Sequence, residues 1–133
     1  MISAQLEIAL HDSFVRAQEK HHKGITVEHL LLQLLGIATI QERLRALGLD
    51  DVGLRGELEL QLSQAEAFSA DEELYTQPTA AFQRTIQQAI LRVQKAHRPE
   101  VTPLDVLDVV LAHPDCLVAD SVVQRRFALL NDK

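Results

Sequence analysis

The chain has a single cysteine, Cys116, among its 133 residues. No disulfide can therefore form within it, which favours a reducing compartment such as the cytoplasm. Tryptophan is absent and aromatic residues make up only 4% of the sequence. A core must then be built from leucine, isoleucine, valine and alanine, and the hydrophobic fraction of 47% is high enough for that. These proportions are typical of closely packed helices.

Other absences narrow the function. The formal net charge of −6 disfavours nonspecific binding to nucleic acid or to an anionic membrane surface, since both need clustered lysine and arginine. No apolar run reaches the ~18 residues of a membrane span. No phosphate-binding loop of the form Gly-x-x-x-x-Gly-Lys-Ser/Thr occurs, so the chain cannot hydrolyse ATP alone. We expect a soluble cytoplasmic protein without a cofactor.

Two stretches of the chain match each other. Gly24–Leu35 and Glu100–Leu111 both contain a threonine followed by an apolar helical run. Thr26 and Thr102 are 76 residues apart (102 − 26 = 76), and the same shift superposes arginine on arginine and histidine on histidine further upstream. The identical upstream pairs are Arg16/Arg92, Gln18/Gln94 and His21/His97. So many matches without a gap indicate an internal repeat.

Apolar spacings of three and four residues predict helices throughout. We expect helices at about 2–21, 26–35, 38–47, 50–67, 79–96 and 102–112, with one or two more after Pro114. The predicted fold is all-α, two pseudo-symmetric repeats of about four helices packed as one domain spanning residues 1–133. Repeat 1 covers about 2–67, a linker 68–78, and repeat 2 about 79–133, shortened at its C-terminal end.

Helix starts and buried faces can be assigned to particular residues. The predicted N-caps are Thr26, Asp50, Thr79 and Thr102, the last with Asp105 reaching back to an amide. Gly24 is expected to supply the left-handed backbone that ends the first helix. The first helix should bury a stripe made of Ile2, Leu6, Ala9, Leu10, Ser13, Phe14 and Ala17. The fourth should bury Val52, Leu54, Leu58 and Leu62.

With these motifs in place, the sequence resembles the N-terminal domain of the Clp chaperone ATPases, most closely the ClpA type. The duplication of a four-helix unit is itself a hallmark of that family. The other motifs that carry the resemblance are Phe14-x-Arg16-Ala17, His22, Thr26–Leu32, Thr76–Thr79 and Phe82–Arg84. The resemblance covers nearly the whole chain and weakens after about residue 112.

The resemblance implies a protein-binding module, with no catalysis of its own, that presents adaptors or unfolded substrates to a chaperone ring for ATP-dependent proteolysis. It implies partner-binding residues at His22, Lys23, Glu28 and Thr79, and an adaptor of the ClpS kind. ClpA-type domains carry an acidic residue where this chain has Lys23. We therefore expect weak or absent ClpS docking, because a reversed charge in an interface costs several kcal/mol. The isolated domain is expected to be a monomer.

A second branch of the family, ClpC, resembles the chain in its duplication and binds arginine phosphate through a glutamate in each repeat. Glu28 fills the first position, but Leu104 occupies the second. We therefore expect no paired arginine-phosphate sites. The alternative overall function is a stand-alone adaptor or decoy whose partner is not ClpS.

Several residues have simpler interpretations. Glu28 also suits the first turn of a helix, where a carboxylate favours the helix dipole, and Thr79 can be only a cap. The histidines and Glu28 around residues 21–29 would make no more than an adventitious zinc site, because a metal needs three or four convergent ligands. Cys116 with His113 could form a nucleophile and base only if the cysteine pKa were lowered. We expect no catalytic and no metal site.

Overall fold

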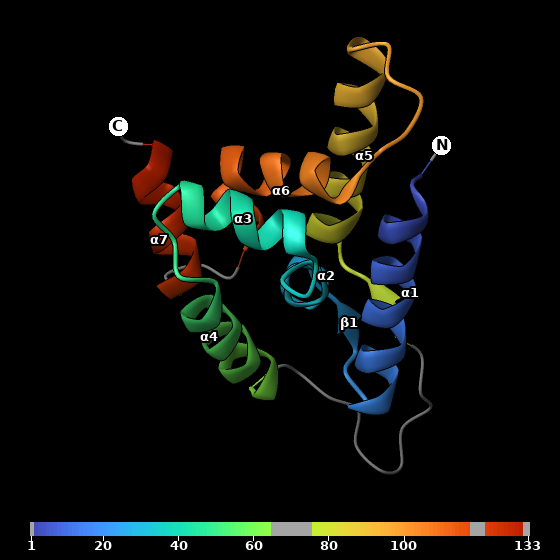
Figure 1. The fold of residues 1–133 in the computed structure, drawn as a ribbon. Coiled ribbons are helices and arrows are strands. Elements are labelled where there is room, and N and C mark those ends of the chain that lie inside the picture. The colour runs from blue at the N-terminus through green and yellow to red at the C-terminus, as the bar shows by residue number, and fades with distance from the viewer. Residues whose placement is uncertain (1, 65–75, 118–121, 132–133) are drawn as a thin grey trace.

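The computed structural model describes residues 2–64, 76–117 and 122–131. The all-α prediction is confirmed, because the only strands in those ranges are two residues long. The predicted linker is described only from Thr76 onward, and its residues 68–75 lie outside these ranges. The elements, shown in Figure 1, are α1 Ala4–Glu19, β1 Gly24–Ile25, α2 Val27–Leu34, α3 Ala38–Ala46, α4 Asp51–Ser63, β2 Gln77–Pro78, α5 Ala80–Lys95, α6 Pro103–Ala112, the 3-10 turn η1 Pro114–Cys116 and α7 Val122–Asn131.

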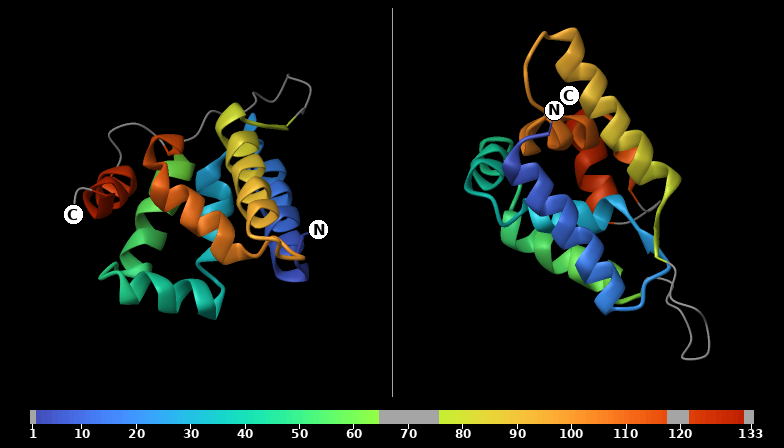
Figure 2. Two further views of the ribbon diagram at one scale, coloured as in Figure 1. Left: turned by 90° about the horizontal axis from the view of Figure 1, so that it is seen from above. Right: turned by 90° about the vertical axis from the view of Figure 1, so that its right-hand side faces the viewer.

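Helix α2 lies at the centre of the molecule. It packs against α1, α4 and α5, and seven of its 8 residues are buried. The views in Figures 1 and 2 show it surrounded by the other helices. The apolar run after Thr26 is therefore the central helix of the core. Its buried leucines belong to one hydrophobic cluster with core residues of both repeats, including Leu54, Leu58 and Val106.

The repeat is visible in the backbone. Helix α5 begins and ends 76 residues after α1 (80 − 4 and 95 − 19), and α6 begins 76 residues after α2 (103 − 27). His21 and His97, related by the same shift, both adopt a left-handed backbone, with φ of 56° and 55°. The prediction that Gly24 supplies this conformation was therefore wrong, because the helix turns at His21 and Gly24 begins β1.

The predicted caps are confirmed. Thr26, Asp50, Thr79 and Thr102 each accept a hydrogen bond from an amide in the following turn. Ser3 does the same for α1, at the position that the shift relates to Thr79 (79 − 3 = 76). The fourth helix breaks the pattern, because the shift would start its counterpart at residue 127 (51 + 76), whereas α7 begins at Val122.

The two repeats exchange short strands. Ile25, just before α2, pairs in parallel with Pro78, just before α5. Val101, just before α6, pairs in parallel with Ile2, just before α1. The 76-residue shift converts one pairing into the other (101 − 25 and 78 − 2). In each pairing, the segment that leads into the first helix of one repeat therefore pairs with the segment that leads into the second helix of the other repeat.

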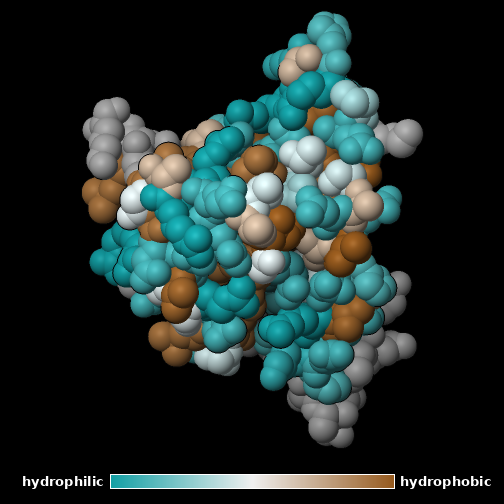
Figure 3. All heavy atoms as spheres, viewed as in Figure 1, coloured by the Kyte–Doolittle hydropathy of each residue, from teal (hydrophilic) through white to brown (hydrophobic). Residues whose placement is uncertain are grey.

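Two apolar residues predicted to be buried are not. Phe14 is 38% exposed and Val52 is 72% exposed. In α1 the buried line has spacings of three and four and consists of Leu6, Ala9, Ser13 and Ala17. Phe14 is one residue, or about 100° of helix, away from Ser13, and Val52 is about 200° from buried Leu54. Figure 3 shows apolar residues scattered between polar ones on the face of the molecule that Figure 1 presents.

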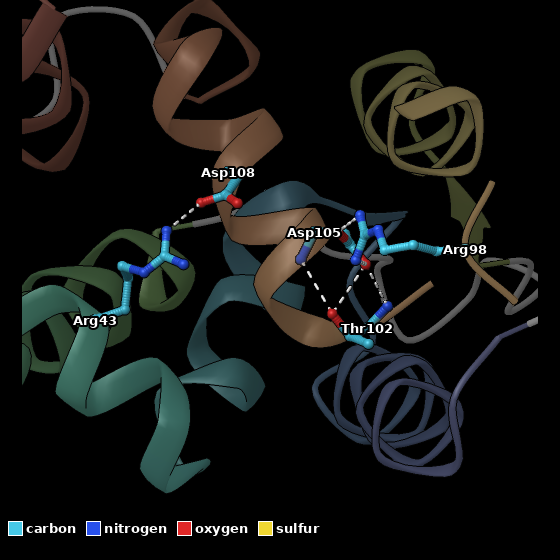
Figure 4. A network of polar contacts seen from close by, with 5 residues as sticks. All are labelled: Arg43, Arg98, Thr102, Asp105 and Asp108. Carbon is cyan, nitrogen blue, oxygen red and sulfur yellow. Dashed lines mark hydrogen bonds and ion pairs between the residues drawn. The ribbon is translucent and has the colours of Figure 1, made fainter. Parts of the chain in front are cut away.

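The described part of the second repeat closes the core. Val123 and Phe127 of α7 are fully buried, and α7 packs against α4, α6 and η1. Across the repeats, Arg43 Nη1 of α3 lies 2.8 Å from Asp108 Oδ1 of α6 (Figure 4). None of the helices in the described ranges combines the length and apolar character that a bilayer crossing needs.

Candidate protein-binding surface

The strand pair β1–β2 brings together segments that are far apart in the sequence. The Lys23 carbonyl accepts the Gln77 amide at 3.2 Å, and the Ile25 carbonyl accepts the Thr79 amide at 3.0 Å. The Thr76 hydroxyl donates to the His22 carbonyl at 2.8 Å. We call residues 22–25 and 76–79 the seam. It places two predicted partner-binding residues, Lys23 and Thr79, on one surface, where both are partly exposed.

A glycine is required in the seam by close approach rather than by backbone angle. A Cβ atom on Gly24 would lie 2.9 Å from Thr79 Cγ2, which is shorter than side chains tolerate. The Thr79 hydroxyl also accepts the Phe82 amide at 3.2 Å and so caps α5. The position of Thr79 is therefore fixed from two sides, by the strand and by the helix.

The other two predicted partner-binding residues lie below the surface. Glu28 is 3% exposed and His22 is 7% exposed. Glu28 lies in the first turn of α2, as predicted. Its charge also reaches the thiol of Cys116, whose pKa is raised to about 11 chiefly by burial and further by this carboxylate. This burial was not predicted, because Glu28 is a charged residue at a helix start.

His29 has a structural role that the sequence analysis missed. The Thr26 hydroxyl accepts the His29 amide at 3.3 Å, and His29 Nδ1 accepts the Thr26 amide at 3.0 Å. These two bonds form a capping box at the start of α2. Since Nδ1 is an acceptor, the ring proton is on Nε2, which donates to His22 Nδ1 at 2.8 Å. The two neutral rings therefore hold the end of the loop after α1 against α2.

In the second repeat, a charged pair takes the place of the two hydrogen-bonded histidines (Figure 4). Asp105 replaces His29 in the capping box and accepts the Thr102 amide at 2.8 Å. Arg98, at the position of His22 (98 − 22 = 76), forms an ion pair with Asp105. Burial alone would raise the pKa of Asp105, but the hydrogen bonds from Arg98 and Thr102 lower it. The loop before the second helix is thus held by two histidines in the first repeat and by an arginine and an aspartate in the second.

This difference predicts acid sensitivity in the first repeat. Burial lowers the pKa of His29 from 6.5 to about 4, with a further contribution from His22. Burial also lowers the pKa of His22, followed by the charge of Lys20. Both groups bind protons more tightly when unfolded, so their stabilisation is complete above pH 6.5 and is lost as the pH falls. We expect the free energy of unfolding to drop by about 2 kcal/mol between pH 7 and 5, measured by urea unfolding.

Two cavities of the described residues extend beyond the seam, and the larger shares the seam residue His22 with it. The larger, about 510 Å³, lies between α1, α2 and α4. Its lining residues are Arg16, Lys20, His22, His29, Leu32, Gln33, Glu59, Leu62 and Ser63. The smaller, about 160 Å³, lies between α5, α6 and η1 and is lined in part by His113 and Cys116.

These details bear on the metal and enzyme hypotheses. In residues 2–64, 76–117 and 122–131, no three His, Cys, Asp or Glu side chains converge as metal ligands. His22 Nδ1 and His29 Nε2 are hydrogen bonded to each other, so neither atom is available as a metal ligand. His113 and Cys116 do share a cavity, but a thiol with a pKa of about 11 is protonated at neutral pH. It therefore lacks the thiolate that a nucleophile needs.

The duplicated helices, the caps and the seam agree with a known family model. The model described as "Clp repeat (R) N-terminal domain" matches residues 1–120. The chain belongs to this family. The predicted resemblance to Clp N-terminal domains is therefore confirmed.

Relatives of the chain include a ClpA homolog protein of Fuscovulum blasticum, which is 34% identical over 112 residues. The match covers 83% of this chain but only 14% of the relative. The N-domain of ClpV from Vibrio cholerae has the same fold, with a TM-score of 0.74 at 17% identity over 98% of this chain and 85% of that one. A ClpV N-domain in complex with a VipB peptide gives a TM-score of 0.71 at 17% identity, covering 98% and 87%.

Proposed function

We propose that this domain is the protein-binding module of a Clp-type ATPase and that its seam receives a protein partner. The observation that carries the proposal is that β1–β2 pairing brings partly exposed Lys23 and Thr79, from the two repeats, onto one surface. His22 and Glu28 lie beneath it, and the His22 carbonyl accepts the Thr76 hydroxyl that joins the two segments. The solved ClpV N-domain with a VipB peptide supports peptide binding as the use of this fold.

The finer assignment follows the ClpA type. In this proposal the partner is an adaptor or an unfolded substrate, and the chaperone ring that unfolds the substrate for proteolysis belongs to the same protein. The 34% identity to a ClpA homolog, of which this chain spans 14% of the length, supports that arrangement. The domain itself performs no catalysis and acts as a monomer. The lone cysteine supports a cytoplasmic location.

Charge at the seam favours a partner other than the usual adaptor. Lys23 stands where ClpA-type domains carry an acid, and the bond from the Gln77 amide to its carbonyl fixes its backbone in the strand pair. We therefore also propose, as the alternative, an adaptor or decoy role with a partner that presents acidic groups.

A binding titration with the adaptor ClpS tests the seam. We expect weak or absent binding by the wild type, and an affinity at least about tenfold higher for Lys23→Glu, equivalent to about 1.4 kcal/mol. Lys95→Glu makes the same charge change in the last turn of α5, away from the seam, and should bind as the wild type does. Isothermal titration calorimetry gives all three affinities.

Glu28→Ala provides the second arm of that titration. Because Glu28 is 3% exposed, its removal should affect binding only through the shape of the seam. Tight wild-type binding that neither Lys23→Glu nor Glu28→Ala changes would show that the partner uses another surface.

A further inference from the structure

A cavity lined by the first repeat alone lies beside the seam and shares only His22 with it. It measures about 510 Å³ and lies between α1, α2 and α4, the helices labelled at the centre and in the lower half of Figure 1. Its apolar part comes from Leu32 and Leu62, and its polar part from the side chains of α1, the two histidines and the end of α4. The volume suits one or two side chains of a bound peptide.

The charge of this cavity is opposite to that of the protein. Arg16 and Lys20 of α1 are exposed cations on its wall, and Glu59 is the acid in its lining. His22 and His29 are neutral at pH 7 because burial lowers the pKa of both. The lining therefore carries a net positive charge in a chain whose formal net charge is −6. A carboxylate is attracted to it, whereas a cation is not.

Comparison with the second repeat shows what is particular to this cavity. The 76-residue shift relates Leu32 to Asp108 and Lys20 to Ala96, so the twin location lacks the counterparts of that apolar residue and of that cation. Asp108 there is paired with Arg43. His22 and His29 are related to Arg98 and Asp105, which form an ion pair where the first repeat has aromatic rings. The combination of apolar residues with two cations, Arg16 and Lys20, is therefore found in the first repeat and not at the related positions of the second.

We propose that this cavity is a second peptide-binding site, which shares only His22 with the seam, and that it takes a segment of a partner protein in which an aliphatic side chain is adjacent to a carboxylate. The aliphatic group packs on Leu32 and Leu62, and the carboxylate pairs with Arg16 and Lys20. The rings of His22 and His29 form the remaining wall and are held in place by Thr26 and by each other.

The test is fluorescence anisotropy with a labelled peptide of alternating leucine and aspartate on a Gly-Ser spacer. A peptide with asparagine in place of each aspartate and an amidated end is the neutral probe. The acidic peptide should bind, and the neutral one should bind at least about threefold more weakly, as for an exposed ion pair. Added salt should reduce only the first affinity.

The repeat supplies matched variants. Arg16→Ala should weaken binding of the acidic peptide about threefold, and Arg16→Ala with Lys20→Ala about tenfold. Arg92→Ala removes the same side chain from the same turn of the twin helix, outside the cavity, and should leave the affinity unchanged. Leu62→Ser, in the partly buried floor, should weaken both peptides alike.

Three results would overturn the proposal: no binding of the acidic peptide at millimolar concentration, equal effects of Arg16→Ala and Arg92→Ala, or equal affinity for the acidic and neutral peptides. The Lys23→Glu variant separates this site from the seam. It should change the affinity for ClpS and leave that for the acidic peptide unaltered, so either proposal can fail alone.

Discussion

Replacing His29 by alanine should lower the free energy of unfolding by about 2–4 kcal/mol. The variant loses the side-chain half of the capping box at the start of the central helix, worth about 1 kcal/mol, and leaves the buried ring of His22 without its partner, a further 1–3 kcal/mol. Urea unfolding followed by circular dichroism gives the difference. His11→Ala, an exposed histidine of α1, should change the same quantity by less than about 0.5 kcal/mol.

The second repeat provides a repair for this variant. His22→Arg combined with His29→Asp transfers the Arg98–Asp105 pair to the first repeat at the same positions. We expect the double variant to be more stable than His29→Ala and to lose the drop in stability between about pH 7 and 5, since the histidines that titrate there are gone. An unchanged drop in the double variant would place the acid-sensitive group elsewhere.

Replacing Phe127 by alanine should cost about 3–5 kcal/mol, the largest effect expected at a single position. Its side chain is fully buried, and it is the largest such side chain in the described residues. Helix α7 brings it against the core between α4 and α6. Thermal or urea unfolding measures the loss.

Leu129→Ala serves as the control on the same helix, because Leu129 is 63% exposed and should change stability little. A Phe127→Ala variant that loses less than about 1 kcal/mol would contradict the packing of both repeats into one cooperative core. The same result would show that α7 is dispensable for folding.

Local chemistry made much of this fold predictable from sequence. A threonine before an apolar run marks a helix start wherever it occurs, so Thr26, Thr79 and Thr102 were assigned correctly. The 76-residue shift then predicted the second copy of the helical pair. Apolar periodicity failed where a helix has apolar residues on more than one face, as at Phe14 and Val52.

What the sequence could not predict depends on contacts between distant segments. The seam was missed because two residues of strand carry no periodic pattern, and Pro78 reads as a chain breaker. Burial of Glu28 was missed because it depends on how other elements pack around the first turn of α2, which no local pattern shows. The role of His29 could have been found, since the shift relates it to Asp105, which was assigned as a capping residue.

The exchange of strands between the repeats constrains the order in which the molecule can form. Ile2 finds its partner only in Val101, 99 residues further along (101 − 2). During synthesis on a ribosome, helix α1 is therefore made long before Val101, the residue that pairs with Ile2 at its start. Closing so long a loop is slow compared with forming a helix, so this pairing should come late in folding. Until then, Ile2 remains without this partner, at the stage when a nascent chain most readily engages other proteins.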